Sequence, residues 1–251
     1  MPKALEPDLA RLYHLNSSNT RSKVADLDLD ESRRPAKRRL DPGAERIPLP
    51  GRGFDLSAPL GATLAARRSR RDLQLSPLPL ETLGRLLFLS FGIAGRRELA
   101  GFPMLDRPFP SAGGLYPLEL YVVAQEVTDL PDGIYHYDPW THELARRRGG
   151  RFHEQLAGIA FGQEVIGRAN LVLCLTAIFA RTTWKYGQRG YRYVLFEAGH
   201  VNHNFYLVAT ALGLSGFAVG GFFDREVSGL LELQAEEEDP LYLFCAGQEG
   251  N

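Results

Sequence analysis

The chain has 251 residues, of which 44% are hydrophobic and 24% charged, and its formal net charge is -1. This length and composition are ordinary for a soluble globular protein made of one domain and an appended segment. The near-neutral charge argues against nucleic acid or an anionic membrane surface as a partner. No stretch approaches the roughly 18 uncharged apolar residues of a spanning helix, and the N-terminus lacks the layout of a signal peptide. We therefore expect a cytoplasmic protein.

The first 50 residues differ in composition from the rest of the chain. We expect residues 1–50 to form an N-terminal arm that is partly disordered, followed by one domain over residues 51–251. The arm holds acidic residues and then a basic run: Asp26, Asp28, Asp30, Glu31, then Arg33, Arg34, Lys37, Arg38, Arg39. The run is either a nucleic-acid patch or a solvated surface, and the acidic residues before it favour the solvated surface. A short apolar cluster would let part of the arm pack on the domain: Leu9, Leu12, Tyr13, Leu15.

The folded elements of the domain are predicted to start near Leu56. Apolar residues recur at helical spacing over residues 80–91, and Gly92 and Gly95 close that helix. Residues 118–124 and 133–138 are rich in β-formers and predict two strands with a turn between them. A short helix is expected over residues 152–161, and the apolar run over residues 169–180 predicts a central buried strand.

The clearest helix in the chain keeps one apolar face from Val194 to Leu212 and stops at Gly213. A short strand over residues 216–219, a helix capped by Asp224 and a last strand over residues 241–246 follow. Strands and helices are mixed without the regular alternation of a parallel doubly wound sheet. The predicted fold class is therefore α+β with a largely antiparallel sheet.

Motifs of several other kinds of site do not occur in the sequence. There is no G-x-G-x-x-G after a strand, no P-loop, no H-E-x-x-H and no C-x-x-C. His200 and His203 are three residues apart on the long helix but lack a nearby third ligand, so no metal site is predicted. The two cysteines, Cys174 and Cys245, lie in apolar runs and are expected to be buried, unreactive thiols.

Two segments in the first half of the domain carry possible ligand chemistry. In residues 67–71 (RRSRR), forked guanidinium donors surround a hydroxyl and suit a phosphate, although such runs are more often solvated surfaces. Residues 110–117 (PSAGGLYP) place small residues between prolines, directly before a strand. They form either a rigid turn through which backbone approaches a planar ligand or a purely structural turn.

Two more such segments lie in the second half. Residues 184–187 (WKYG) occupy a polar segment between the buried strand and the long helix. If Arg181, Arg189 and Arg192 lie close by, their charge would favour a neutral amine on Lys185 and make it a usable general base. Lys185 and Tyr186 are expected to reach one substrate only from an irregular loop, because adjacent side chains of a strand point to opposite faces. The glycine pair at residues 220–221 either brings backbone amides near a flavin or phosphate or is only a sharp connection.

Taken together and in this order, the four segments resemble the SagB-type dehydrogenases of the nitroreductase superfamily. That group includes the azoline oxidases of thiazole- and oxazole-containing peptide pathways. The resemblance covers about residues 57–247 and is strongest in PSAGGLYPLELYVVA, DGIYHYDP, WKYG and FEAGHVNHNFYLVATALGL. Tyr13 and His14, followed by a Ser/Asn stretch, also resemble the leader region of that family.

The resemblance implies a nitroreductase-like fold, a mostly antiparallel sheet flanked by helices, and a homodimer that holds FMN at its two-fold interface. The residues implied to hold the FMN phosphate are Arg67, Arg68, Ser69 and Arg71. Those implied to lie against the cofactor or its ring are Pro110, Ser111, Ala112, Gly113, Gly114, Gly220 and Gly221. Lys185 and Tyr186 are the implied catalytic pair. One departure is that the chain ends GQEGN, without the basic residues that many nitroreductases add near the C-terminus to grip the phosphate.

The activity implied by the resemblance is the oxidation of thiazoline or oxazoline rings in a peptide to azoles, with O2 reoxidising the flavin. The implied partners are the azoline peptide and a cyclodehydratase complex, with neither nucleic acid nor membrane. An NAD(P)H-dependent nitroreductase or quinone reductase has the same fold and cofactor but does not need Lys185. A scaffold subunit that has lost the flavin is a third alternative, against which the intact Arg/Ser segment and glycine turns argue.

Overall fold

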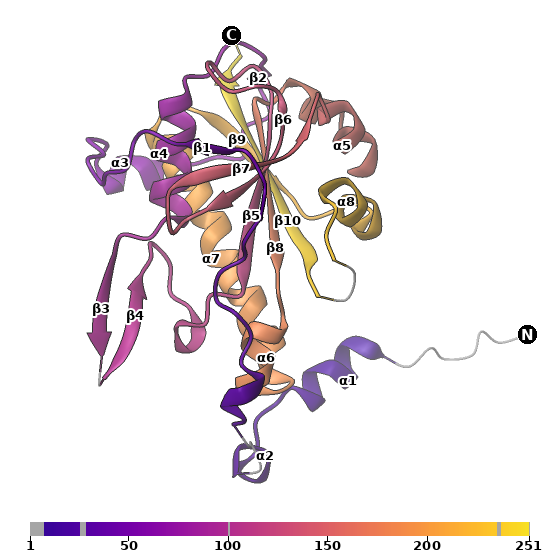
Figure 1. Ribbon diagram of the computed structural model, residues 1–251. Coiled ribbons are helices and arrows are strands. Elements are labelled where there is room, and N and C mark those ends of the chain that lie inside the picture. The colour runs from indigo at the N-terminus through magenta and orange to yellow at the C-terminus, as the bar shows by residue number, and fades with distance from the viewer. Residues whose placement is uncertain (1–7, 26–28, 100, 235–236, 251) are drawn as a thin grey trace, which may run out of the picture.

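The computed structural model describes residues 8–25, 29–99, 101–234 and 237–250, so that Asp26 and Asp28 lie outside the described residues. An eight-stranded sheet dominates it, in the order β1-β7-β6-β5-β8-β10-β2, with β9 also paired to β10 (Figure 1). The strands are β1 (Arg46–Pro48), β2 (Leu73–Gln74), β5 (Leu118–Ala124), β6 (Gly133–Asp138), β7 (Glu143–Gly149), β8 (Leu171–Ala177), β9 (Ser215–Val219) and β10 (Asp239–Glu249). Their pairings are antiparallel, which confirms the predicted fold class.

The centre of the sheet is the pair β5 and β8, which are buried along their whole length. Tyr121 faces Cys174 in their register, and Val122 faces Leu173. Successive side chains of a strand point to opposite faces, so each strand feeds two hydrophobic cores. Leu120, Val122 and Leu173 belong to one core, and Tyr121, Val123 and Cys174 to the other.

Helices cover both faces of the sheet and make three layers (Figure 1). The first core packs against α4 (Leu80–Phe91) and α7 (Arg189–Ala211), and the second against α5 (His153–Ile159) and α8 (Asp224–Leu231). The other α-helices are α1 (Leu9–Asn16), α2 (Arg21–Ala25), α3 (Leu60–Ala66) and α6 (Ala180–Tyr186). Gly213 has a φ of +73° just after α7, which is the left-handed ending expected of a glycine there.

Several elements differ from the sequence prediction. The central strand ends at Ala177, and the residues that follow begin α6 instead of continuing the strand. Asp224 is the first residue of α8 and makes no side-chain cap, although a carboxylate in a first turn is still favourable. The hairpin of β3 (Gly95–Leu99) and β4 (Phe102–Asp106) and the charged strand β7 were not predicted, because neither has a run of β-formers.

The arm joins the sheet earlier than Leu56, since β1 pairs with the edge of β7. The expectation of a solvated basic run is wrong for two of its members: Arg38 is 2.6 Å from Asp138, and Arg39 pairs with buried Glu238. The leucines of α1 do not pack on the domain. Leu9, Leu12 and Leu15 are 46% to 70% exposed, and Tyr13 alone stacks edge-on against Tyr191.

Both cysteines are buried and free, as expected. Burial raises the pKa of the Cys174 thiol to about 12 and that of Cys245 further still. The thiolate is the reactive form of cysteine, so both thiols are unreactive at neutral pH. No helix among the described residues has the length and apolar character needed to cross a membrane.

Candidate functional site

The Arg/Ser segment lies between α3 and β2, where it packs against α7 and β9. The Ser69 hydroxyl is exposed and 2.9 Å from the Tyr206 hydroxyl, which in turn accepts a hydrogen bond from the Ala218 amide. The Arg67 guanidinium stacks over the Tyr206 ring, and that of Arg71 over Phe217. The aromatic rings thus hold two guanidiniums without neutralising them, which leaves their forked donors for an anion.

A cleft of about 200 Å³ opens beside this segment, lined by Arg68, Arg70, Tyr206 and Glu249 among others. The Arg68 guanidinium donates to the backbone carbonyls of Ala65 and Arg67 and so covers the end of α3. Arg70 forms an ion pair with Glu249. The C-terminal strand therefore brings an acidic residue to this cleft. That residue pairs with Arg70, the one arginine of the run that was not proposed to bind phosphate.

The small-residue turn makes direct contact with the lysine-tyrosine pair. Gly113 and Gly114 have φ of +62° and +61°, in the left-handed region that favours glycine. A Cβ added at Gly113 would lie 2.6 Å from the Tyr186 hydroxyl and 3.3 Å from the Lys185 Nζ. Two of the predicted segments thus meet at one point, although Gly113 and Tyr186 are 73 residues apart in the chain. Pro110 and Ala112 flank the turn, and the Ser111 hydroxyl accepts a hydrogen bond from the Tyr116 amide.

Lys185 and Tyr186 reach this point from the end of a helix and not from the irregular loop that the sequence suggested. They are the last two residues of α6, which Gly187 ends with a φ of +53°. Both side chains are half-buried. The end of the helix lets the amine and the hydroxyl approach the same glycine from one side.

The three arginines expected around Lys185 are each engaged elsewhere. Arg181 lies 2.7 Å from Glu119, and Arg189 and Arg192 donate to Ser17 in the arm. Cations of the arm lie on this side of α6: burial lowers the pKa of Lys37, and the charges of Arg34 and Lys185 lower it further.

The glycine pair follows β9 at another place on the surface. Gly220 is exposed, and a Cβ at Gly221 would lie 2.9 Å from the Phe161 ring. Phe161 in turn stacks edge-on with Phe223, and these two exposed rings border the turn. A connection tight against an aromatic ring accounts for Gly221 without a ligand.

Sequence reasoning missed a buried acid beneath the small-residue turn. Glu197, on α7, is 2% exposed, and its Oε1 has no hydrogen-bond partner among the described residues. Burial raises the pKa of Glu197 to about 7, against the opposing effects of the Ser111 hydroxyl and the Arg107 guanidinium. The signal was present in the sequence, since a glutamate within the apolar face of a helix is rarely buried without a partner.

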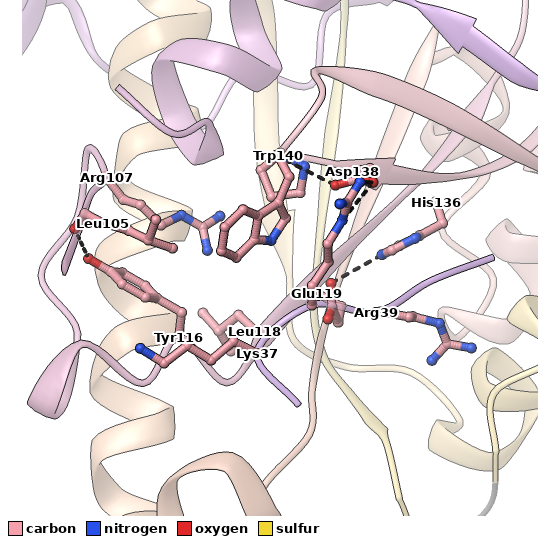
Figure 2. Close-up of a pocket in the computed structure, with 12 residues that line it drawn as sticks. Lys37, Arg39, Leu105, Arg107, Tyr116, Leu118, Glu119, His136, Asp138 and Trp140 are labelled. Carbon is pink, nitrogen blue, oxygen red and sulfur yellow. Dashed lines mark hydrogen bonds and ion pairs between the residues drawn. The ribbon is translucent and has the colours of Figure 1, made fainter. Parts of the chain in front are cut away.

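A second polar centre was also missed, because its members are far apart in the sequence. Figure 2 shows two of its members, Glu119 of β5 and His136 of β6, with Lys37 and Arg39 of the arm nearby. His136 lies between two carboxylates, with Nδ1 2.6 Å from Asp41 and Nε2 3.1 Å from Glu119. Burial alone would lower the pKa of His136, but these hydrogen bonds outweigh it and raise the pKa to about 9. The cavity here is about 10 Å³, room for roughly one water, so the cluster fastens the arm and is no substrate site.

Apart from the glycine pair, the candidate residues form two groups that lie toward opposite ends of α7 (Figure 1). Tyr186 packs against Tyr193 near the start of the helix, whereas Ser69 bonds to Tyr206 near its end. The helical rise of 1.5 Å per residue separates Tyr193 from Tyr206 by about 20 Å.

Comparison with known proteins identifies a family. The family model described as the nitroreductase family matches residues 64–248. The chain is 40% identical over 185 residues to MJ1384 of Methanocaldococcus jannaschii, which bears the provisional name of a nitroreductase; this covers 74% of the chain and 88% of MJ1384. It is 31% identical over 148 residues to the microcin B17-processing protein McbC of Escherichia coli, covering 56% of the chain and 54% of McbC.

Solved structures agree with this assignment. A nitroreductase-like structure from Anabaena variabilis has a TM-score of 0.77 and 26% identity to the chain. The match covers 95% of the chain and 46% of the Anabaena protein. The E. coli microcin synthetase McbBCD complex, with truncated pro-MccB17 bound, has a TM-score of 0.64. It covers 97% of the chain and 92% of the matched chain at 21% identity, which is a likeness of fold. The aligned segment covers about half of McbC, and the chain spans about half the length of the Anabaena protein.

Proposed function

The chain belongs to the nitroreductase family, and from this premise we propose that it is an FMN-dependent dehydrogenase of the SagB type that oxidises azoline rings in a peptide to azoles. The observation that carries the proposal is the meeting of Lys185 and Tyr186 at Gly113. A reductase of small electrophiles has no need of an amine and a phenol at that turn, whereas removal of a ring proton needs a positioned base. The similarity to McbC, a microcin-processing protein, favours a peptide as the substrate.

The chemical types of the candidate residues suit a flavin mononucleotide. Arg67, Arg68, Ser69 and Arg71 offer guanidinium donors and a hydroxyl, the set that suits a phosphate. The turn at Gly113 and Gly114 exposes backbone where a side chain would collide with its neighbours, so a flat ring can approach it. Bound flavin supplies the acceptor for the hydride equivalent that the azoline ring gives up.

We propose a homodimer, because the two groups of residues lie toward opposite ends of α7. Two copies that pair with their α7 helices antiparallel place the Arg/Ser segment of one chain near the small-residue turn of the other. Leu195 and Phe196 on α7 are 42% and 55% exposed and supply apolar surface for such a contact. Each site then contains residues of both subunits.

The chain's own part in the reaction is to hold the ring and take a proton. An azoline becomes an azole by losing a proton from one ring carbon and a hydride equivalent from the next. The Lys185 amine is the base proposed to accept the proton, and the Tyr186 hydroxyl, next to it at Gly113, polarises the ring or relays the proton. The Ser111 hydroxyl of the turn and the Arg107 guanidinium both act on the carboxyl of Glu197, which places this acid of α7 beside the turn.

We propose a soluble cytoplasmic enzyme that works beside a cyclodehydratase, the class of enzyme that forms azolines.

The relation to MJ1384 favours a second candidate, an NAD(P)H-dependent reductase of small electrophiles. Absorbance of the purified protein tests both. We expect yellow protein whose flavin band is bleached by a synthetic azoline peptide without O2, and slowly or not at all by NADPH. Rapid bleaching by NADPH alone would support the reductase. Colourless protein that binds no added FMN and binds a cyclodehydratase tightly would support a scaffold subunit instead.

A further inference from the structure

The arm forms one wall of two open cavities, and the other wall comes from α6 in one and from the connection between α6 and α7 in the other. The first cavity, of about 350 Å³, lies between arm residues 16–19 with Lys23 and residues 186–189 at the end of α6. The second, of about 390 Å³, lies between Asp30, Arg33 and Pro35 of the arm and Ala180, Thr183 and Trp184 of α6. The volumes match those of small-ligand sites, which run from about 300 to 1,000 Å³. The proposed catalytic Tyr186 is thus part of the rim of a cavity that the arm completes.

The arm's wall of the first cavity is fixed in place by hydrogen bonds. Ser17 is 1% exposed, and its hydroxyl accepts a hydrogen bond of 2.8 Å from Arg192 of α7. The Lys23 amine donates to the backbone carbonyl of Asn16 at 2.8 Å, and Arg189 donates to that of Ser17. The wall is therefore preorganised, and a ligand does not have to order it on binding.

Two neutral carboxamides line the cavity beside two cations. Lys23 and Arg189 each direct a donor at a backbone carbonyl and keep their charge. Asn19 and Gln188 face the cavity from opposite walls, both are exposed, and neither side chain makes a hydrogen bond within the described residues. A carboxamide both donates and accepts, which complements the N–H and C=O groups of a peptide backbone.

We propose that this cavity binds the peptide backbone that flanks the ring being oxidised. The inference rests on the proposed function, which puts the ring at Lys185 and Tyr186. Because Tyr186 contributes to both places, the residues next to a ring held there enter the cavity, and Asn19 and Gln188 hydrogen-bond to their amides. The N-terminal arm is then a substrate-binding element, and the enzyme prefers a ring within a peptide to the same ring alone.

The experiment compares two synthetic substrates in full-length, FMN-loaded protein. One is a pentapeptide whose central ring is a thiazoline between glycines, and the other is 2-methylthiazoline-4-carboxamide. In the double variant Asn19→Ala/Gln188→Ala we expect kcat/KM for the pentapeptide to fall at least tenfold, since two hydrogen bonds are lost. We expect kcat/KM for the small ring to change less than twofold. Gln155→Ala, a carboxamide exposed on α5, is the matched control and leaves both values unchanged.

Binding is measured separately, by fluorescence anisotropy with a labelled pentapeptide whose ring is already the thiazole. The double variant should bind it at least tenfold more weakly than the wild type and the Gln155→Ala control. Equal affinity in all three, or an equal loss of kcat/KM for both substrates, overturns the inference. Wild-type protein that binds the peptide but oxidises neither substrate refutes the proposed function alone, and the affinities still decide the inference.

Discussion

At the scale of single residues, the contact of Lys185 and Tyr186 with Gly113 can be tested by removing each functional group. We expect Lys185→Ala and Tyr186→Phe to keep the flavin, because neither substitution changes the Arg/Ser segment that is proposed to hold its phosphate. Turnover of an azoline peptide should fall by about 10²- to 10⁴-fold for loss of a general base. Flavin content by absorbance and turnover under O2 measure the two effects. Yellow protein with undiminished oxidase activity in both variants contradicts the assignment.

Gly113 itself gives a second prediction. Gly113→Ala puts a Cβ 2.6 Å from the Tyr186 hydroxyl, so the phenol must move. The left-handed φ of +62° adds about 1–2 kcal/mol of backbone strain. We expect at least a tenfold loss of kcat with a Tm only a few degrees lower.

Gly43→Ala is the matched control for that loss. Gly43 also has a positive φ, of +78°, but a Cβ there meets nothing within 4 Å. It should cost similar stability and leave kcat unchanged. If both variants lose kcat to the same degree, the strain and not the displaced phenol is responsible.

At the scale of secondary-structure elements, periodicity predicted those parts of the fold that follow one pattern along their length. The helices α4 and α7 and the buried strands β5 and β8 were found, because their apolar residues face the cores described above. The strand β7 was missed because three consecutive arginines hide its alternation. The short helix α6 was missed because the apolar run of β8 continues to Ala180, three residues beyond the end of the strand at Ala177.

The candidate site was predictable to a similar extent. The four segments could be found in the sequence because each has a local composition that suits its chemistry. The contact between Gly113 and Tyr186 could not be predicted from their spacing in the sequence, because the fold brings the two residues together. The cluster of Asp41, Glu119 and His136 was beyond reach for the same reason, since it joins three elements that have no sequence pattern in common.

The fastening of the arm to β5 and β6 predicts a loss of stability in alkali. Folded His136 has a pKa of about 9 against an ordinary 6.5, so its contribution is complete below pH 6.5 and is lost as the pH rises through 9. The loss is on the order of 3 kcal/mol, at 1.36 kcal/mol per unit. We expect the free energy of unfolding in urea to fall between pH 7 and 9.5. Glu197, with a pKa of about 7, has its own effect at lower pH.

His136→Gln separates this contribution from the others. The variant keeps hydrogen-bonding groups between Asp41 and Glu119 but cannot carry the proton. It should be less stable than the wild type at pH 7 and show a flatter profile up to pH 9.5. A wild-type profile that is level or rising over this range contradicts the prediction. If the variant does not fold, the His136 proton can be followed by NMR in the wild type.

At the scale of the whole molecule, the division of the candidate site between the two ends of α7 predicts that flavin binding depends on association. Leu195 and Phe196 lie on the exposed side of that helix. In a two-fold interface each substitution occurs twice, so Leu195→Glu/Phe196→Glu brings four carboxylates together. We expect the double variant to be monomeric by light scattering and to bind FMN at least tenfold more weakly, although the Arg/Ser segment of each chain is intact. Leu75→Glu, which changes an exposed leucine next to β2, should leave the dimer and its flavin unchanged. A monomeric variant with full FMN affinity would mean that one chain suffices for the site, and a variant that stays dimeric would place the interface away from α7.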